Sequence, residues 1–392
     1  MDRKLQRTLM LKVLSHIEAG TTDMAESVYR QPAANYADAG RAAQEQALLF
    51  QRGPLMMALS CRVPNPGDYI TDDMAGIPVL IVRGEDGVVR GFRNACSHRG
   101  TRVCEGAGHA RALSCPYHGW TYALDGRLRG IPDKRSFPGV ELVDHGLPPL
   151  PTVERHGMVW MHPMPAPDGT TTFDIAPHLG DLDAELASYG LAAYHHYDQR
   201  IVERPMNWKL VMDTFLEPYH LGVLHRDTVA PLFVHNLCLF EPFGVHLREL
   251  LPRTSIAAQG VRADQELDAV KHNSIIYVLF PNTVIVIQVD HIETWRVFPV
   301  EGRPDKCVMQ LDFVVSEPIE SDSARRHWER NLDLTIRTVL NEDFATAIGM
   351  HRNYALGSPP EAMFGRNEPA LAHFERTVNE QVAARAASSV AT

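Results

Sequence analysis

The spacing of apolar positions differs along the first part of the chain. Up to about residue 50, apolar residues recur at helical spacing over 9–19 and 39–50, which predicts a helical segment. From Pro54 the runs become short and β-like, as in 77–82 and 88–92, which are separated by a turn that contains two glycines. This pattern predicts that a small β-rich domain follows the helical segment.

The second half of the chain shows strands followed by one long helix. The apolar runs 275–287, 292–298 and 311–315 are typical of consecutive strands of an antiparallel sheet. A helix is expected next, with Ser321 or Ser323 as its N-cap and with a body that continues to about residue 350. We expect the Ala/Ser-rich tail after Val382 to be frayed.

A proline-rich stretch, 163–169, reads as a linker between two domains. The expected organisation is therefore a helical segment over 1–50, a β-rich domain over 51–165 and a larger domain over 166–392. No internal repeat interrupts this order.

Composition and charge exclude several classes of protein. The chain has 392 residues, 45% of them hydrophobic and 22% charged, which is ordinary for a soluble globular enzyme. Its net charge of −10 argues against a nucleic-acid surface, which needs an excess of Lys and Arg. Six cysteines in a chain of this length do not form a disulfide framework. We see neither a secretory signal nor a membrane-spanning apolar run, and expect a cytoplasmic protein with no membrane partner.

The most informative motif pairs Cys96 and His98 with Cys115 and His118. Two thiolates and two imidazoles in this arrangement are the signature of a Rieske [2Fe–2S] cluster, in which two Cys bind one iron and two His bind the other. A tetrahedral zinc site is the alternative, because two Cys and two His also satisfy zinc. Zinc fingers usually pair Cys with Cys and His with His, whereas each half of this motif contains one of each. The motif therefore predicts a protein that transfers single electrons.

A second constellation lies between residues 207 and 225. On one continuous helix, Asp213, Glu217 and His220 would share a face, at i, i+4 and i+7. His225 can converge on the same ion if the helix loosens near Gly222. These residues predict a metal site with two histidine ligands. A carboxylate ligand is still needed to complete it.

Asp343 is the expected third ligand. It falls within the apolar stripe of the long C-terminal helix, where a bare carboxylate costs several kcal/mol unless it is paired or metal-bound. His220, His225 and Asp343 would form the two-His-one-carboxylate triad that holds non-haem Fe(II). An ion pair with Arg337 is the alternative for Asp343, and Glu342 would point about 100° away from it on an α-helix.

Both motifs together resemble the catalytic (α) subunit of Rieske non-haem iron oxygenases, over essentially residues 45–355. The matching stretches are Cys-Ser-His-Arg-Gly, Cys-Pro-Tyr-His-Gly-Trp-Thr-Tyr, Asn-Trp-Lys and Glu-Pro-Tyr-His. The resemblance implies an α+β fold: a small antiparallel-β Rieske domain and a helix-grip (START-like) catalytic domain, on which the N-terminal helical segment packs. It also implies a homotrimer, and electrons from NAD(P)H through a separate reductase, with or without a ferredoxin.

The resemblance further suggests roles for two acidic residues. Glu217 would connect His118 of one subunit to His220 of the next, and Asp213 would support the iron ligands. Most relatives carry Asp at the position of Glu217, whereas relatives that oxidise quaternary ammonium compounds carry Glu. In addition, Trp120 replaces a serine that hydrogen-bonds the cluster in respiratory Rieske proteins, which predicts a lower potential.

Two functions follow from these observations. The first is an oxygenase that uses O2 to hydroxylate a small organic substrate, either aromatic or quaternary-ammonium-like, by mono- or dioxygenation. The second is a Rieske electron-transfer or ligand-binding protein without a working mononuclear iron. Arg248 and His291 are candidates for recognising a polar group of the substrate, and Phe215, Phe233 and Tyr277 are among the candidates for an apolar pocket.

Overall fold

The computed structural model describes residues 1–258 and 267–390, and the chain divides into two compact units. The larger unit comprises Met1–Leu49, Leu179–Tyr189 and Tyr194–Thr392, and the smaller unit comprises Phe50–His178 and Gly190–Ala193. Among the described residues, no helix combines the length and the apolar character that a membrane crossing requires.

The smaller unit is built from short antiparallel strands in three sheets. A five-stranded sheet has the order β10-β5-β4-β3-β6, and two three-stranded sheets have the orders β11-β12-β2 and β7-β8-β9. Their bounds are β2 Leu55–Leu59, β3 Asp68–Asp72, β4 Val79–Arg83, β5 Val89–Arg93, β6 Ala107–His109, β7 Leu113–Ser114, β8 Thr121–Tyr122, β9 Leu128–Gly130, β10 Pro149–Leu150, β11 Thr152–Arg155 and β12 Met158–Met161. The predicted hairpin of residues 77–92 is confirmed as β4 and β5.

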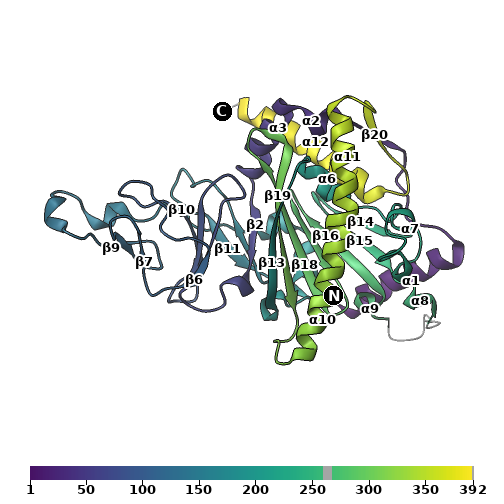
Figure 1. Ribbon diagram of the computed structural model, residues 1–392, viewed down its shortest axis with the longest axis horizontal. Helices are drawn as coiled ribbons and strands as arrows, with labels where there is room; N and C mark the ends of the chain where they lie inside the picture. The colour runs from purple at the N-terminus through teal and green to yellow at the C-terminus, as the bar shows by residue number, and fades with distance from the viewer. Residues whose placement is uncertain (259–266, 391–392) are drawn as a thin grey trace. The chain divides into compact units, whose positions relative to one another are not determined.

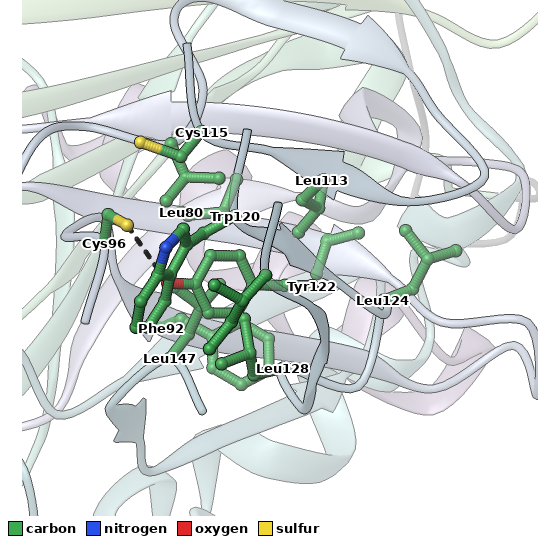
Figure 2. Close-up of a cluster of buried hydrophobic side chains, with 13 residues drawn as sticks. Leu80, Phe92, Cys96, Leu113, Cys115, Trp120, Tyr122, Leu124, Leu128 and Leu147 are labelled. Carbon is green, nitrogen blue, oxygen red and sulfur yellow. Dashed lines mark hydrogen bonds between the residues drawn. The ribbon is translucent and has the colours of Figure 1, made fainter. Parts of the chain in front are cut away.

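One hydrophobic cluster fills the space between the five-stranded sheet and the sheet β7-β8-β9. Figure 2 shows its side chains, with the sulfurs of Cys96 and Cys115 at one end of the cluster. Phe92, Trp120 and Tyr122 are its aromatic members, and each is at most 3% exposed. Burial of such rings is the main source of stability in a β-unit of this size. The two cysteines are therefore held by a packed core on one side.

A seven-stranded antiparallel sheet forms the centre of the larger unit, in the order β13-β19-β18-β17-β16-β15-β14 (Figure 1). Its strands are β13 His195–Arg204, β14 Leu239–Phe243, β15 His246–Pro252, β16 Asn273–Leu279, β17 Thr283–Ile287, β18 His291–Val300 and β19 Arg303–Val315. The predicted strands of 275–315 are confirmed as β16–β19. Three strands, β13, β14 and β15, were not predicted.

The long helix predicted after Ser321 is confirmed from its start to beyond residue 350, although one turn within it has π-helical and not α-helical geometry. Ser321 is the N-cap of α10 (Asp322–Thr338), and its side chain accepts from the N–H of Ala324 at 3.1 Å. A single π-helical turn (Val339–Asp343) then precedes α11 (Phe344–Ala355). Figure 1 shows α10 and α11 lying along the sheet. Contacts of Trp328 with Phe313 and of Phe344 with Trp295 join the two layers.

The chain ends complete the larger unit. The N-terminal segment is helical as predicted, with α1 Arg3–Ala19, α2 Ala34–Ala37, α3 Ala39–Glu45 and a π-turn at Gln46–Phe50, but it also contains strand β1 (Tyr29–Pro32), paired with β20 (Glu361–Phe364). Helix α12 runs from Pro369 to Val390, so the tail that was expected to be frayed after Val382 is helical as far as Val390, and its last two residues lie outside the described residues. The short helices are α4 Ala176–Leu179, α5 Leu182–Ala187, α6 Trp208–Asp213, α7 Leu221–Leu224, α8 Ser255–Ala258 and α9 Ala269–His272.

Candidate metal centres

The four Cys and His residues of the first motif lie on two loops with the same backbone pattern. In each loop the cysteine N–H donates to the carbonyl five residues on, at 2.8 Å for Cys96 and 2.9 Å for Cys115. The N–H of the following glycine, Gly100 or Gly119, donates back to the cysteine carbonyl. Both glycines have positive φ (77° and 71°), which a residue with a Cβ adopts only at a cost. The sequence repeat thus becomes two matching metal-binding loops.

Burial distinguishes the thiols from the imidazoles. Cys96 and Cys115 are 4% and 3% exposed, whereas His98 is half-buried and His118 is exposed. The two imidazole centroids are 4.7 Å apart, and the ring of His98 stacks on Trp120 at 4.9 Å. A cluster with two irons fits this arrangement, with a Cys-bound iron against the core and a His-bound iron toward solvent.

The spacing of the four donors does not fit a single zinc ion. Donors around one zinc lie at most about 4.6 Å apart, because zinc bonds to S and N are about 2.0–2.3 Å long. Among the described residues, no three of Cys96, His98, Cys115 and His118 have ligand atoms within 4.8 Å of one another. This distance disfavours the zinc alternative.

Tyr122 is a residue of this centre that the sequence reasoning missed. Its hydroxyl lies 3.1 Å from Cys96 Sγ, and it also contacts the N–H and Oγ of Ser97 at 3.0 and 2.9 Å. Burial raises the pKa of Tyr122 to about 12, so the phenol keeps its proton and can donate to a thiolate. The signal in the sequence is the position of Tyr122 two residues after Trp120, because side chains at i and i+2 of an extended segment point to the same side.

The second centre does not lie on one continuous helix, contrary to the prediction. Helix α6 ends at Asp213, turns follow as far as His220, and α7 occupies only Leu221–Leu224. Glu217 still reaches His220, because its carboxylate accepts from the His220 N–H at 3.0 Å as well as from the ring. Gly222 permits a close approach, since a Cβ at this position would lie 2.5 Å from the ring of His235.

The structure brings His220, His225 and Asp343 together. Their ligand atoms all lie within 4.8 Å of one another, with Asp343 Oδ1 2.9 Å from His225 Nε2 and 3.4 Å from His220 Nε2. Asp343 makes no ion pair with Arg337 within the described part of the chain. Three convergent donors, two imidazoles and one carboxylate, fit a non-haem Fe(II) and leave other coordination positions open.

Two further carboxylates hold the outer nitrogens of the imidazoles. Glu217 accepts from Nδ1 of His220, and Glu342 accepts from Nδ1 of His225 at 2.5 Å. Each contact leaves the Nε2 lone pair directed at the metal position, which fixes the tautomer that a ligand needs. Asp343, and not Glu342, joins the triad, as the helix geometry predicted, but the contact of Glu342 with the outer nitrogen of His225 was not predicted.

The electrostatics of the metal-free triad follow from this crowding of carboxylates. Burial lowers the pKa of His220, but hydrogen bonds with Asp343 and Glu217 outweigh it and raise the pKa to about 10. The pKa of His225 is raised in the same way, against burial, by Asp343 and Glu342. Metal binding at neutral pH therefore displaces a proton from the His220 ring.

Asp213 lies beside the centre without a hydrogen bond to any of the three donors within the described part of the chain. Its Oδ2 accepts from the Tyr36 hydroxyl at 2.8 Å. Burial, together with the charge of Glu375, raises the pKa of Asp213 well above its usual value. The geometry thus links Asp213 to the N-terminal helices, whereas Glu217 contacts the triad directly.

A cavity of about 350 Å³ opens onto the triad from one side. Of the residues expected around a pocket, Phe215, Phe233 and His291 line it. Tyr277 and Arg248 do not, because both lie in a buried network with Glu185, which accepts from the Tyr277 hydroxyl and from the Arg248 guanidinium. The sheet contributes apolar side chains such as Leu251, Ile276 and Val286, whereas α10 contributes mostly polar ones, among them His327, Asn331 and Thr335.

Both units match known protein families. Residues 54–151 match the Rieske [2Fe-2S] domain, and residues 188–384 match the catalytic domain of the ring-hydroxylating alpha subunit. The chain belongs to the ring-hydroxylating alpha subunit family. These two domains imply a Rieske cluster and a mononuclear iron as cofactors, in agreement with the two groups of donors.

Relatives include oxygenases that act on different substrates. The chain is 31% identical over 195 residues to the glycine betaine monooxygenase oxygenase subunit of Chromohalobacter salexigens, covering 50% of this chain and 42% of the relative. It is 30% identical over 274 residues to the biphenyl 2,3-dioxygenase subunit alpha of Rhodococcus jostii, covering 68% and 56%. The chain therefore spans about half the length of the curated relatives it matches.

Solved structures share the fold. The quaternary ammonium Rieske monooxygenase CntA has a TM-score of 0.76 at 20% identity, with 92% of this chain and 96% of that chain covered. Naphthalene 1,2-dioxygenase from Rhodococcus sp. has a TM-score of 0.74 at 19% identity, with 99% of each chain covered. The α+β fold with two antiparallel-sheet units is thereby confirmed.

Proposed function

We propose that the chain is the oxygenase component of a Rieske system, which uses O2 and electrons that originate from NAD(P)H to hydroxylate a small organic substrate. The convergence of His220, His225 and Asp343 at the wall of a cavity carries this proposal. An electron carrier without a working second iron is not favoured, because it has no use for a complete triad beside a cavity. Relatives named for glycine betaine, carnitine and biphenyl support an aromatic or quaternary ammonium substrate.

The residues have separate tasks in this reaction. Cys96, His98, Cys115 and His118 hold the cluster, and His220, His225 and Asp343 hold the iron. When bound, the iron supplies the activation of O2, and the cluster supplies single electrons to it. Glu217 and Glu342 keep both imidazoles in the orientation that binds metal, and the apolar walls of the cavity exclude bulk water from the substrate.

The proposal includes an assembly. Two observations support it: His118 is exposed, which suits a cluster that passes electrons to another molecule, and the Glu217 carboxylate is bonded to Nδ1 of His220. We propose a homotrimer in which Glu217 links His118 of one subunit to His220 of the next. A separate reductase, with or without a ferredoxin, delivers the electrons.

A labelling experiment tests the activity. The purified chain is supplied with NADH, a reductase from a related system, ¹⁸O2 and a panel of aromatic and quaternary ammonium compounds. The expected result is substrate-dependent consumption of O2 and ¹⁸O in an organic product. Cluster reduction without labelled product from any compound, in a protein that carries its full iron, would count against the oxygenase and for the electron carrier.

A further inference from the structure

The 350 Å³ cavity is lined by an arginine whose hydrogen-bonding capacity is not fully used. Arg253, directly after β15, lines this cavity together with the metal triad. Its Nη2 donates to the side-chain oxygen of Gln288, and its guanidinium lies 5.3 Å from the ring centroid of Phe233. Its Nε is buried and has no hydrogen-bond partner. Within the described residues, no carboxylate forms an ion pair with Arg253.

The acidic residues near Arg253 are already matched with donors. Asp290 accepts from Nδ1 of His291 at 2.8 Å and from Nε2 of His327 at 2.7 Å. Glu293 accepts from the Thr335 hydroxyl at 2.8 Å and from the Trp295 indole at 3.2 Å. An additional acceptor is therefore needed beside Arg253, because its Nε is a donor without a partner.

Burial of the positive charge of Arg253 costs free energy, and a bound anion would remove that cost. Burial lowers the pKa of Arg253, and the negative charge of Asp290 offsets only part of this shift. A planar guanidinium with free donors matches a carboxylate, which can accept two parallel hydrogen bonds. The apolar walls, among them Leu232, Leu251 and Leu334, suit the body of such a molecule.

We propose that Arg253 forms a carboxylate-binding subsite, so that the substrate is a small organic acid whose apolar body lies between Arg253 and the iron. This inference rests on the proposed function and narrows its substrate class. Arg253 would hold the acid end of the molecule and so determine which carbon lies beside the metal. Arg248, which the sequence offered for this role, is excluded because Glu185 and Glu241 already pair with it.

Binding of matched acids and amides tests the subsite without turnover. The probes are benzoate, phenylacetate and hexanoate, each beside its amide, measured by calorimetry and ligand-detected NMR on the iron-loaded protein. The variants are Arg253→Gln, which removes the charge, and Arg253→Lys, which keeps the charge without the planar fork. Arg303→Gln is the control, because Arg303 is 57% exposed and pairs with Asp305 on the surface.

We expect at least one acid to bind at least tenfold more tightly than its amide, a preference that R253Q removes, R253K weakens and R303Q leaves unchanged. Equal binding of every acid and its amide, including no binding, would overturn the subsite. A preference that survives R253Q would also overturn it, because it would show direct coordination of the acid to iron. Iron and sulfide contents of the same samples report separately on the proposed function.

Discussion

The two groups of metal-binding residues are assembled from the chain in different ways. The donors of the smaller unit all lie between residues 96 and 118, on two loops with the same backbone hydrogen bonds. The donors of the larger unit come from α7 and its flanks and from the distant π-turn at Val339–Asp343. A centre made by local loops is specified by its own motif, whereas a centre made by distant elements depends on helix phase and on the carboxylates around it.

The variant with the largest expected effect removes one metal centre and leaves the other. Cys115→Ser takes away a buried thiolate, and a [2Fe–2S] cluster does not persist without its cysteine ligands. We expect complete loss of the cluster, seen as two fewer irons and two fewer sulfides per chain, with the mononuclear iron retained. Cys104→Ser is the matched control, since burial raises the pKa of the Cys104 thiol to about 11 and it lies outside the motif. Loss of all iron from C115S would show that the two centres depend on each other.

The second test concerns the carboxylate that the π-turn brings to His225. In Glu342→Gln the carboxylate that accepts from Nδ1 of His225 is replaced by an uncharged amide. Loss of such a partner of a metal-binding histidine typically lowers metal affinity or activity by about 10–100-fold. We expect Fe(II) to bind that much more weakly in metal titrations, while the cluster spectrum stays unchanged. Glu329→Gln, on the exposed face of α10, should behave as wild type. Unchanged iron affinity in E342Q would mean that the contact with His225 does not matter.

A third test uses a buried acid near the triad that is not a ligand. Burial raises the pKa of Glu249 to about 8, although a hydrogen bond with the Cys238 thiol acts in the opposite direction. The folded protein therefore keeps a proton that the unfolded chain releases above its ordinary pKa of 4.5. Stability from this group is complete below pH 4.5 and is lost as pH rises toward 8. We expect Glu249→Gln to exceed wild type in free energy of unfolding at pH 9 by about 1–3 kcal/mol, and not at pH 5.

Denaturant unfolding at the two pH values measures this difference, with Glu301→Gln, an exposed glutamate, as the control. If E249Q and wild type differed by the same amount at both pH values, the stabilisation would come from packing and not from the proton.

The smallest expected effect concerns the potential of the cluster. Tyr122→Phe removes the hydroxyl that lies 3.1 Å from Cys96 Sγ. Fewer hydrogen bonds to the sulfurs lower the potential, by roughly 40 mV for a one-electron couple if the bond is worth about 1 kcal/mol. A redox titration followed by EPR measures the shift. Tyr117→Phe, on the exposed tip of the second loop, is the control, and a Y122F potential equal to wild type would remove Tyr122 from the centre.

Local signals in the sequence predicted much of the fold. Alternating or continuous apolar runs gave β4, β5 and β16–β19, and Ser321 gave the start of α10. Strand β13 was missed because it is a largely polar edge strand, paired only with β19. Strand β15 was missed because Arg248 and Glu249 interrupt its apolar pattern, although the whole strand is buried.

The convergence of the three proposed ligands could be predicted, but the contacts that support them could not. His220, His225 and Asp343 were recognised by residue type and spacing. Glu342 was correctly set aside as a ligand, but its contact with His225 was not predicted, and Glu217 was assigned to a helical face that does not exist. Such contacts depend on a local π-turn and on turns around Pro218, which residue periodicity does not encode.

Quantitation of iron and acid-labile sulfide, with EPR of the dithionite-reduced protein, tests the central claim most directly. It compares the wild-type chain with the His220→Ala/His225→Ala double variant, both purified without O2. The account predicts about three irons and two sulfides per wild-type chain with a Rieske-type signal, and loss of only one iron in the variant. Two irons in both proteins would contradict it, because the triad would then hold no iron and the chain would be an electron carrier.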